Sequence, residues 1–148
     1  MTDCIDLKWD LSMLSGCPQL KSFRVFTWHC PLKPTGELND LRVLRNTLEV
    51  LVLSACHEVR GNFMDLADFP RLRWLDLLCT SIVGDIRDIG RDDFLSIETR
   101  FLLPRTVVGG RGYEFQRISD VPSFMESIHP LLKRKHIFDS YFYQDELN

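Results

Sequence analysis

The sequence lacks the features of a membrane or secreted protein. No apolar run approaches the roughly 18 residues that a membrane-spanning helix requires, and the chain has no Asn-x-Ser/Thr glycosylation site. Its first residues include acidic side chains where a secretory signal carries basic ones, and no long apolar segment follows them. We therefore expect a cytoplasmic protein with no membrane partner.

An excess of positive charge is also lacking, because the formal net charge of the 148 residues is −3. A protein that binds nucleic acid by neutralising phosphates needs a basic face. The sequence therefore predicts no nucleic-acid partner. Its hydrophobic content of 45% and charged content of 26% are typical of a folded globular protein. We expect one domain over residues 1–148.

An even, clustered set of cysteines is absent as well. The five cysteines are spread along the chain, at Cys4, Cys17, Cys30, Cys56 and Cys79. A disulfide framework in a secreted domain usually uses an even number. Free, partly buried thiols in a reducing compartment explain this distribution more simply.

What the chain does contain is one pattern written twice in succession, over Thr47–Pro70 and Arg71–Phe94. Each copy has apolar residues spaced LxxLxL and then GxΦxxΦ, where Φ is apolar. The matching positions are Leu48, Leu51, Leu53, Val59, Gly61, Phe63 and Leu66 in the first copy, and Leu72, Leu75, Leu77, Ile82, Gly84, Ile86 and Ile89 in the second. The leucines recur after 24 residues, a spacing typical of stacked repeat proteins.

Looser copies flank this pair. Leu20, Phe23 and Val25 predict an earlier LxxLxL segment, and Asp10 is placed to cap a short helical turn that carries Leu11 and Leu14. Gly36, Leu38 and Leu41 repeat the GxΦxxΦ frame, and Ile97, Phe101 and Leu103 predict the apolar face of a further strand before Pro104. Apolar residues at three- and four-residue spacing over 121–132 predict an amphipathic C-terminal helix.

These motifs resemble the leucine-rich repeat family over about residues 7–104. The Ile82–Ile86 segment is similar to the IxGxI frame of plant-type repeats, and the style of the later glycine motifs resembles short repeat proteins abundant in diatoms and related algae. The resemblance implies an α/β solenoid of about four to five repeats, with a parallel inner sheet and short helices or turns outside. The amphipathic helix would then cap it, within a cap and tail of about 105–148. The chain departs from the family at the usual asparagine position, where it carries Trp28, Cys56 and Thr80.

The family resemblance implies that the inner face binds another protein. Side chains alternate across a strand, which places Ser22, Arg24, Phe26, Val50, Val52, Ser54, Trp74, Asp76 and Leu78 on that face. Of these we expect Arg24, Phe26, Trp74 and Asp76 to contact the partner, because aromatic residues and arginine dominate interfaces. The apolar members are equally explained by packing under a loop or by partial exposure.

No chemical site emerges beside this face, so we expect no catalytic activity, no metal and no cofactor. The pairs His29-Cys30 and Cys56-His57 lie in equivalent turns, but adjacent residues do not easily ligate one zinc ion. The glycines at 109, 110 and 112 lack the lysine of a phosphate-binding loop. The alternative function is a structural or regulatory fragment, or one repeat block of a larger receptor or adaptor. An uncapped end would then favour a homo-oligomer.

Overall fold

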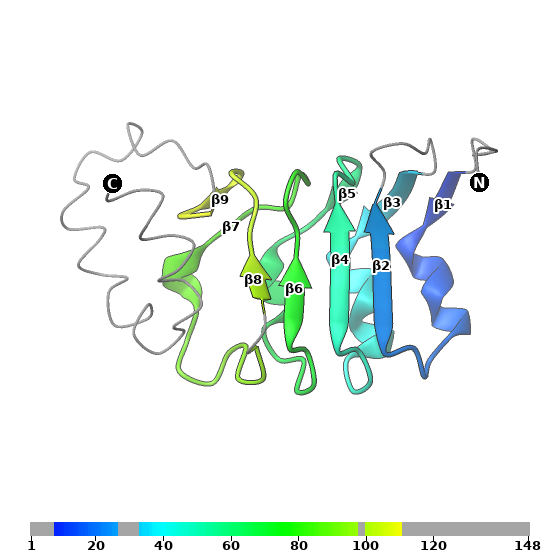
Figure 1. The fold of residues 1–148 in the computed structure, drawn as a ribbon, viewed down its shortest axis with the longest axis horizontal. Coiled ribbons are helices and arrows are strands. Elements are labelled where there is room, and N and C mark those ends of the chain that lie inside the picture. Colours follow the sequence, from blue (N-terminus) through cyan, green and yellow to red (C-terminus); the bar gives the residue numbers. More distant parts are fainter. Residues whose placement is uncertain (1–7, 27–32, 98–99, 111–148) are drawn as a thin grey trace.

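The computed structural model describes residues 8–26, 33–97 and 100–110. In these residues nine short strands are linked by turns and by four 3₁₀ helices, in a mixed α/β arrangement (Figure 1). The strands are β1 (Lys8–Asp10), β2 (Ser22–Phe26), β3 (Lys33–Glu37), β4 (Val50–Ser54), β5 (Val59–Arg60), β6 (Trp74–Asp76), β7 (Gly84–Asp85), β8 (Arg100–Leu102) and β9 (Val107–Val108). The helices are η1 (Leu11–Gly16), η2 (Leu38–Leu44), η3 (Phe63–Leu66) and η4 (Ile86–Asp88).

The main sheet is parallel and has the strand order β2-β4-β6-β8. Its register carries one row of core side chains straight across the sheet: Phe23 pairs with Leu51, Leu51 with Leu75, and Leu75 with Phe101. The 24-residue spacing of the leucines is therefore the step from β4 to β6, and the steps from β2 to β4 and from β6 to β8 are 28 and 26 residues. The prediction of a parallel sheet built from the LxL segments is confirmed.

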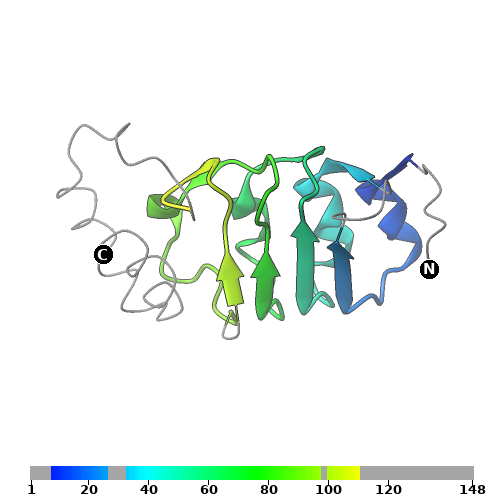
Figure 2. The ribbon, with the colours of Figure 1, turned by 45° about the horizontal axis from the view of Figure 1, so that its top comes forward.

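The 3₁₀ helices lie along one side of this sheet (Figure 2). Smaller parallel ladders run along another edge, with the order β1-β3-β5 in one sheet and the pair β7-β9 in another. A single bridge between Asn62 and Val83 lies between them in the chain. Each unit of the chain thus contributes one strand to the main sheet and one short segment to an outer ladder.

Three equivalent glycines make these units possible. Gly36, Gly61 and Gly84 all have positive φ, at 114°, 122° and 138°, a region that glycine enters far more readily than other residues. A Cβ at Gly84 would lie 2.6 Å from the ring of Phe63 in the preceding unit. The glycine of the GxΦxxΦ motif is therefore required both by its backbone conformation and by the close approach of its neighbour.

A polar cap precedes three of the four helices. The side chains of Asp10, Asn62 and Asp85 each accept a hydrogen bond of 2.9 Å from the backbone N–H two residues later. Such caps satisfy one of the unpaired N–H groups at a helix start. The expectation that Asp10 caps a helical turn is confirmed, and that turn is a 3₁₀ helix whose Leu11 is fully buried.

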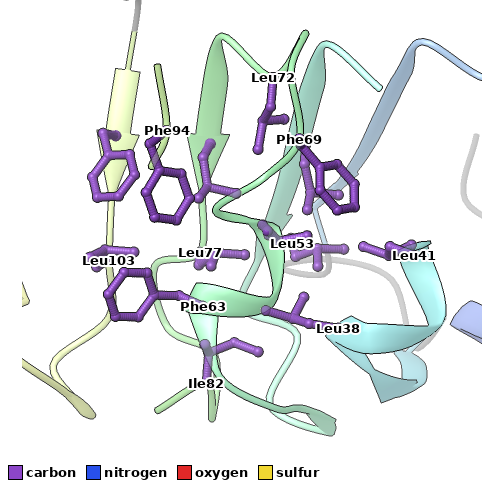
Figure 3. Close-up of a cluster of buried hydrophobic side chains, with 14 of the residues drawn as sticks. Leu38, Leu41, Leu53, Phe63, Phe69, Leu72, Leu77, Ile82, Phe94 and Leu103 are labelled. Atoms are coloured by element: carbon purple, nitrogen blue, oxygen red, sulfur yellow. The ribbon is translucent and has the colours of Figure 1, made fainter. Parts of the chain in front are cut away.

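The core lies between the main sheet and the helices (Figure 3). All six leucines of the two LxxLxL copies are at most 1% exposed. Three phenylalanines pack together beyond them: the Phe94 ring lies 4.9 Å from that of Phe101 and 5.8 Å from that of Phe63, measured between centroids. Phe101 belongs to the further strand predicted from Ile97, Phe101 and Leu103, and all three of these residues are buried.

The predicted C-terminal helix over 121–132 and the turn at Trp28 lie outside the described residues. Among the residues that are described, no helix has both the length and the apolar character that crossing a membrane requires.

Candidate functional site

One face of the main sheet is turned away from the 3₁₀ helices (Figures 1 and 2). The core takes the alternate residues of each strand, Phe23, Leu51, Leu75 and Phe101 among them, so the remaining residues point to the other face. We call this the open sheet face. It comprises Ser22, Arg24, Val50, Val52, Ser54, Trp74, Asp76 and Arg100. Leu102 follows the same alternation but belongs to the hydrophobic core.

Three long side chains form a stack on the open sheet face. The guanidinium carbon of Arg24 lies 4.8 Å from the centroid of the Trp74 ring, and that of Arg100 lies 5.6 Å from it. Both distances are within the range of cation–π attraction, worth about 0.5–1 kcal/mol at an exposed site. Neither guanidinium forms an ion pair with a carboxylate in the described part of the chain. Two arginine side chains that form no ion pair with any described residue therefore flank one aromatic ring.

Arg24 on β2 reaches Trp74 on β6 across the intervening strand β4. Arg24 pairs in register with Val52 on β4, and Trp74 on β6 pairs with Val50. Strands β2 and β6 are separated by β4, about 10 Å in all. The Arg24 guanidinium reaches the Trp74 ring only by crossing above β4. Val50 and Val52, on this intervening strand, are 2% and 1% exposed, although they are not members of the main hydrophobic cluster.

The indole N–H of Trp74 is buried and finds no hydrogen-bond acceptor among the described residues. Buried polar groups in folded proteins nearly always have a partner, and Trp side chains usually place their N–H against one. The remainder of the residue is half-buried. The stack therefore holds an unused donor next to two unpaired cations.

The other predicted contact residues are placed differently. Asp76 is 9% exposed, and its Oδ1 accepts a hydrogen bond of 3.1 Å from the backbone N–H of Leu78. Phe26 lies at the end of β2, paired with Ser54, and the position of its side chain is outside the described part. Leu78 is partly buried and packs against the core. Arg24 and Trp74 are brought together, whereas Asp76 is tied to the adjacent turn.

Arg100 was not among the predicted contact residues. The signal for it was present, because Arg100 precedes Phe101 as Trp74 precedes Leu75. The pairing of those two core residues puts Arg100 beside Trp74 on the next strand.

A cavity lies among the turns that follow the strands of the main sheet. It has a volume of about 530 Å³, crosses three successive turns and is lined by His57, Leu78, Cys79, Thr80, Ser81, Pro104, Arg105 and Thr106. Its hydroxyl groups already donate to backbone carbonyls: Thr80 to Leu77 at 2.7 Å, Ser81 to His57 at 2.7 Å, and Thr106 to Ile82. These bonds tie neighbouring turns together, and they leave no hydroxyl poised as a nucleophile.

The thiols differ sharply in environment. Burial raises the pKa of the Cys56 thiol to about 12, and its Sγ lies 3.7 Å from the Ser54 carbonyl oxygen. A thiol that stays protonated at neutral pH is a poor nucleophile and metal ligand. Cys17 and Cys79 are exposed and free. No three potential metal ligands come together within the described ranges.

Comparison with protein-family models, with curated proteins and with solved structures found no match to this chain.

Proposed function

We propose that this chain is a leucine-rich-repeat solenoid that binds another protein through the open sheet face and has no catalytic activity of its own. The 24-residue spacing and the in-register parallel strands support the repeat architecture. The observation that carries the function is the Arg24–Trp74–Arg100 stack. Aromatic and arginine side chains with unused hydrogen-bonding capacity are the residues that dominate protein interfaces.

Affinity capture from a cell lysate tests this function. The wild-type chain is compared with Trp74→Ala and with the double variant Arg24→Ala/Arg100→Ala. The matched control is Arg60→Ala/Arg91→Ala, which removes the same charge from two exposed arginines away from the open sheet face. Asp76 is left intact, because its bond to Leu78 gives it a part in the local structure.

A protein captured by the wild type and by the control, and lost with both face variants, would support the proposal. Equal capture by all four chains would contradict it. Thermal unfolding of each variant shows that any loss of capture comes from a folded protein.

A second candidate function is structural stacking through the β2 end of the sheet. In the β2 layer, Leu20, Phe23 and Val25 are only half-buried, whereas Leu48, Leu51 and Leu53 in the next layer are fully buried. A second copy seated on this end would complete the burial. The mass in solution tests this: a dimer or larger species that dissociates on Phe23→Glu substitution supports stacking, and a monomer at all concentrations opposes it.

A further inference from the structure

We infer that the open sheet face recognises an acidic segment of its partner in extended conformation, with carboxylates meeting Arg24 and Arg100. This inference rests on the proposed function and adds the chemistry of the partner. It is argued from the charge of the face, the spacing of its two cations and the unused donor of Trp74.

The described part of the main sheet carries more basic than acidic side chains, whereas the whole chain has a net charge of −3. On the four strands and the described residues immediately before them, the ionisable side chains are Lys21, Arg24, Glu49, Arg73, Asp76 and Arg100, so basic groups outnumber acidic ones. Glu49 lies 3.7 Å from Arg73 and offsets it. Asp76 is bonded to the Leu78 backbone. Among the described residues, no carboxylate forms an ion pair with Arg24 or Arg100, and two such cations on one face favour an anionic ligand.

The spacing of the two guanidinium groups fits an extended peptide. Each lies within 6 Å of the same ring centroid, so the two cannot be more than about 10 Å apart. In an extended chain, side chains two residues apart point the same way and are separated by about 7 Å. A Glu-x-Glu segment can therefore present one carboxylate to each arginine, and arginine–carboxylate hydrogen bonds are among the strongest in proteins.

The Trp74 indole N–H supplies a third contact. It is buried, and none of the described residues accepts a hydrogen bond from it; an unpaired buried donor destabilises the state that contains it. Binding of the segment has to expose this N–H, because it is buried in the unbound chain. A carbonyl or carboxylate oxygen of the bound segment can then accept a hydrogen bond from this N–H.

A single-stranded nucleic acid would also offer negative charge, but the face suits it less well. Bases bind such proteins by stacking on exposed aromatic rings, and two guanidinium groups already lie within stacking range of the Trp74 ring. The net charge of −3 also opposes a polyanion of that length.

Fluorescence anisotropy with a dye-labelled peptide of alternating Glu and Ser tests the inference on the full chain. A Gln-Ser peptide of equal length is the neutral control, and a labelled oligo-dT strand is the nucleic-acid arm. The Glu-Ser peptide should bind wild type and Arg60→Ala/Arg91→Ala equally, and bind Arg24→Ala/Arg100→Ala at least about tenfold more weakly. Binding should also weaken as salt is raised.

Three results would overturn the inference: no binding of the Glu-Ser peptide, equal weakening by both double variants, or tighter binding of oligo-dT than of the peptide. The lysate capture distinguishes these failures from failure of the proposed function. A protein captured through Trp74 would leave the binding face established even if the acidic peptide does not bind.

Discussion

The two faces of the main sheet are both buried at their centre, but by different means. On the core face, Leu53 belongs to the hydrophobic core between the main sheet and the 3₁₀ helices, and it is fully buried. On the open sheet face, the adjacent Val52 is 1% exposed, and Arg24, its partner in register, extends to the Trp74 ring. On the core face, a layer of packed helices keeps the apolar side chains buried. Long side chains held by cation–π contacts can move, and they leave the surface beneath them available to a partner.

The largest effect should come from the core face. Leu53→Ala removes a fully buried side chain from between two packed layers, where the surroundings cannot collapse into the space. We expect a loss of about 2–5 kcal/mol in the free energy of unfolding, as for other leucines in packed cores. Urea unfolding followed by circular dichroism measures it. A loss below about 1 kcal/mol would show that the core face is no better packed than the open one.

The next effect concerns the glycines that let the units stack. Gly84→Ala places a Cβ 2.6 Å from the Phe63 ring at a φ of 138°, and we expect it to lower stability by about 1–3 kcal/mol. Gly16→Ala is the matched control, because a Cβ there meets nothing within 4 Å. Thermal unfolding of the two variants should separate them clearly, and equal melting temperatures would refute the requirement for glycine at position 84.

A smaller effect is expected from the open sheet face. Val52→Ala removes two methyl groups from the open sheet face, where we expect long side chains such as Arg24 to settle into the space. We expect a loss of about 1 kcal/mol, less than the full transfer free energy of the removed groups. Urea unfolding of Val52→Ala and Leu53→Ala in the same series compares the packing of the two faces of the main sheet directly. Equal losses for these two neighbours would mean that the cover on the open face is as rigid as the core.

The smallest effect is expected at an exposed ion pair on the helix side. Arg42 donates to both carboxylate oxygens of Asp68 at 3.0 and 2.8 Å, and this bonding lowers the pKa of Asp68 to about 2. Because the folded-state pKa lies below the ordinary 3.8, the stabilisation is fully present above 3.8 and is lost as the pH falls toward 2.

Both side chains are more than a third exposed, so Asp68→Asn should reduce stability by only about 0.2–1 kcal/mol. Unfolding titrations at pH 6 and pH 3 should show a smaller difference from wild type at the lower pH. A difference that grows on acidification would contradict the assignment.

The spacing of apolar residues was enough to predict the core. LxxLxL alternation combined with the 24-residue repeat predicted which leucines are buried and that their strands are parallel, because each pattern has one arrangement that buries every apolar side chain. The caps were less evident: Asp10 was anticipated, but Asn62 and Asp85 were not. Asn62 and Asp85 are equivalent because each follows the glycine of a GxΦxxΦ motif. This becomes clear only when Gly61 and Gly84 are aligned.

The open sheet face was predicted only in part. Arg24 and Trp74 were placed on one face by strand alternation, but their contact depends on side-chain length and strand separation, which no sequence pattern encodes. For Val50 and Val52 the sequence left packing and partial exposure as alternatives, and both side chains are buried. Arg100 was missed because its strand was predicted from its apolar residues alone.

The measurement that tests the central claim most directly follows the Trp74 indole N–H by NMR. The chain has three tryptophans, so its ¹H–¹⁵N spectrum contains a small set of indole signals, and Trp74→Phe identifies the one of interest. On titration with the Glu-Ser peptide, we predict that the Trp74 signal moves downfield as the N–H gains an acceptor, while the Trp9 and Trp28 signals stay in place. An unmoved Trp74 signal at saturating peptide would contradict the account.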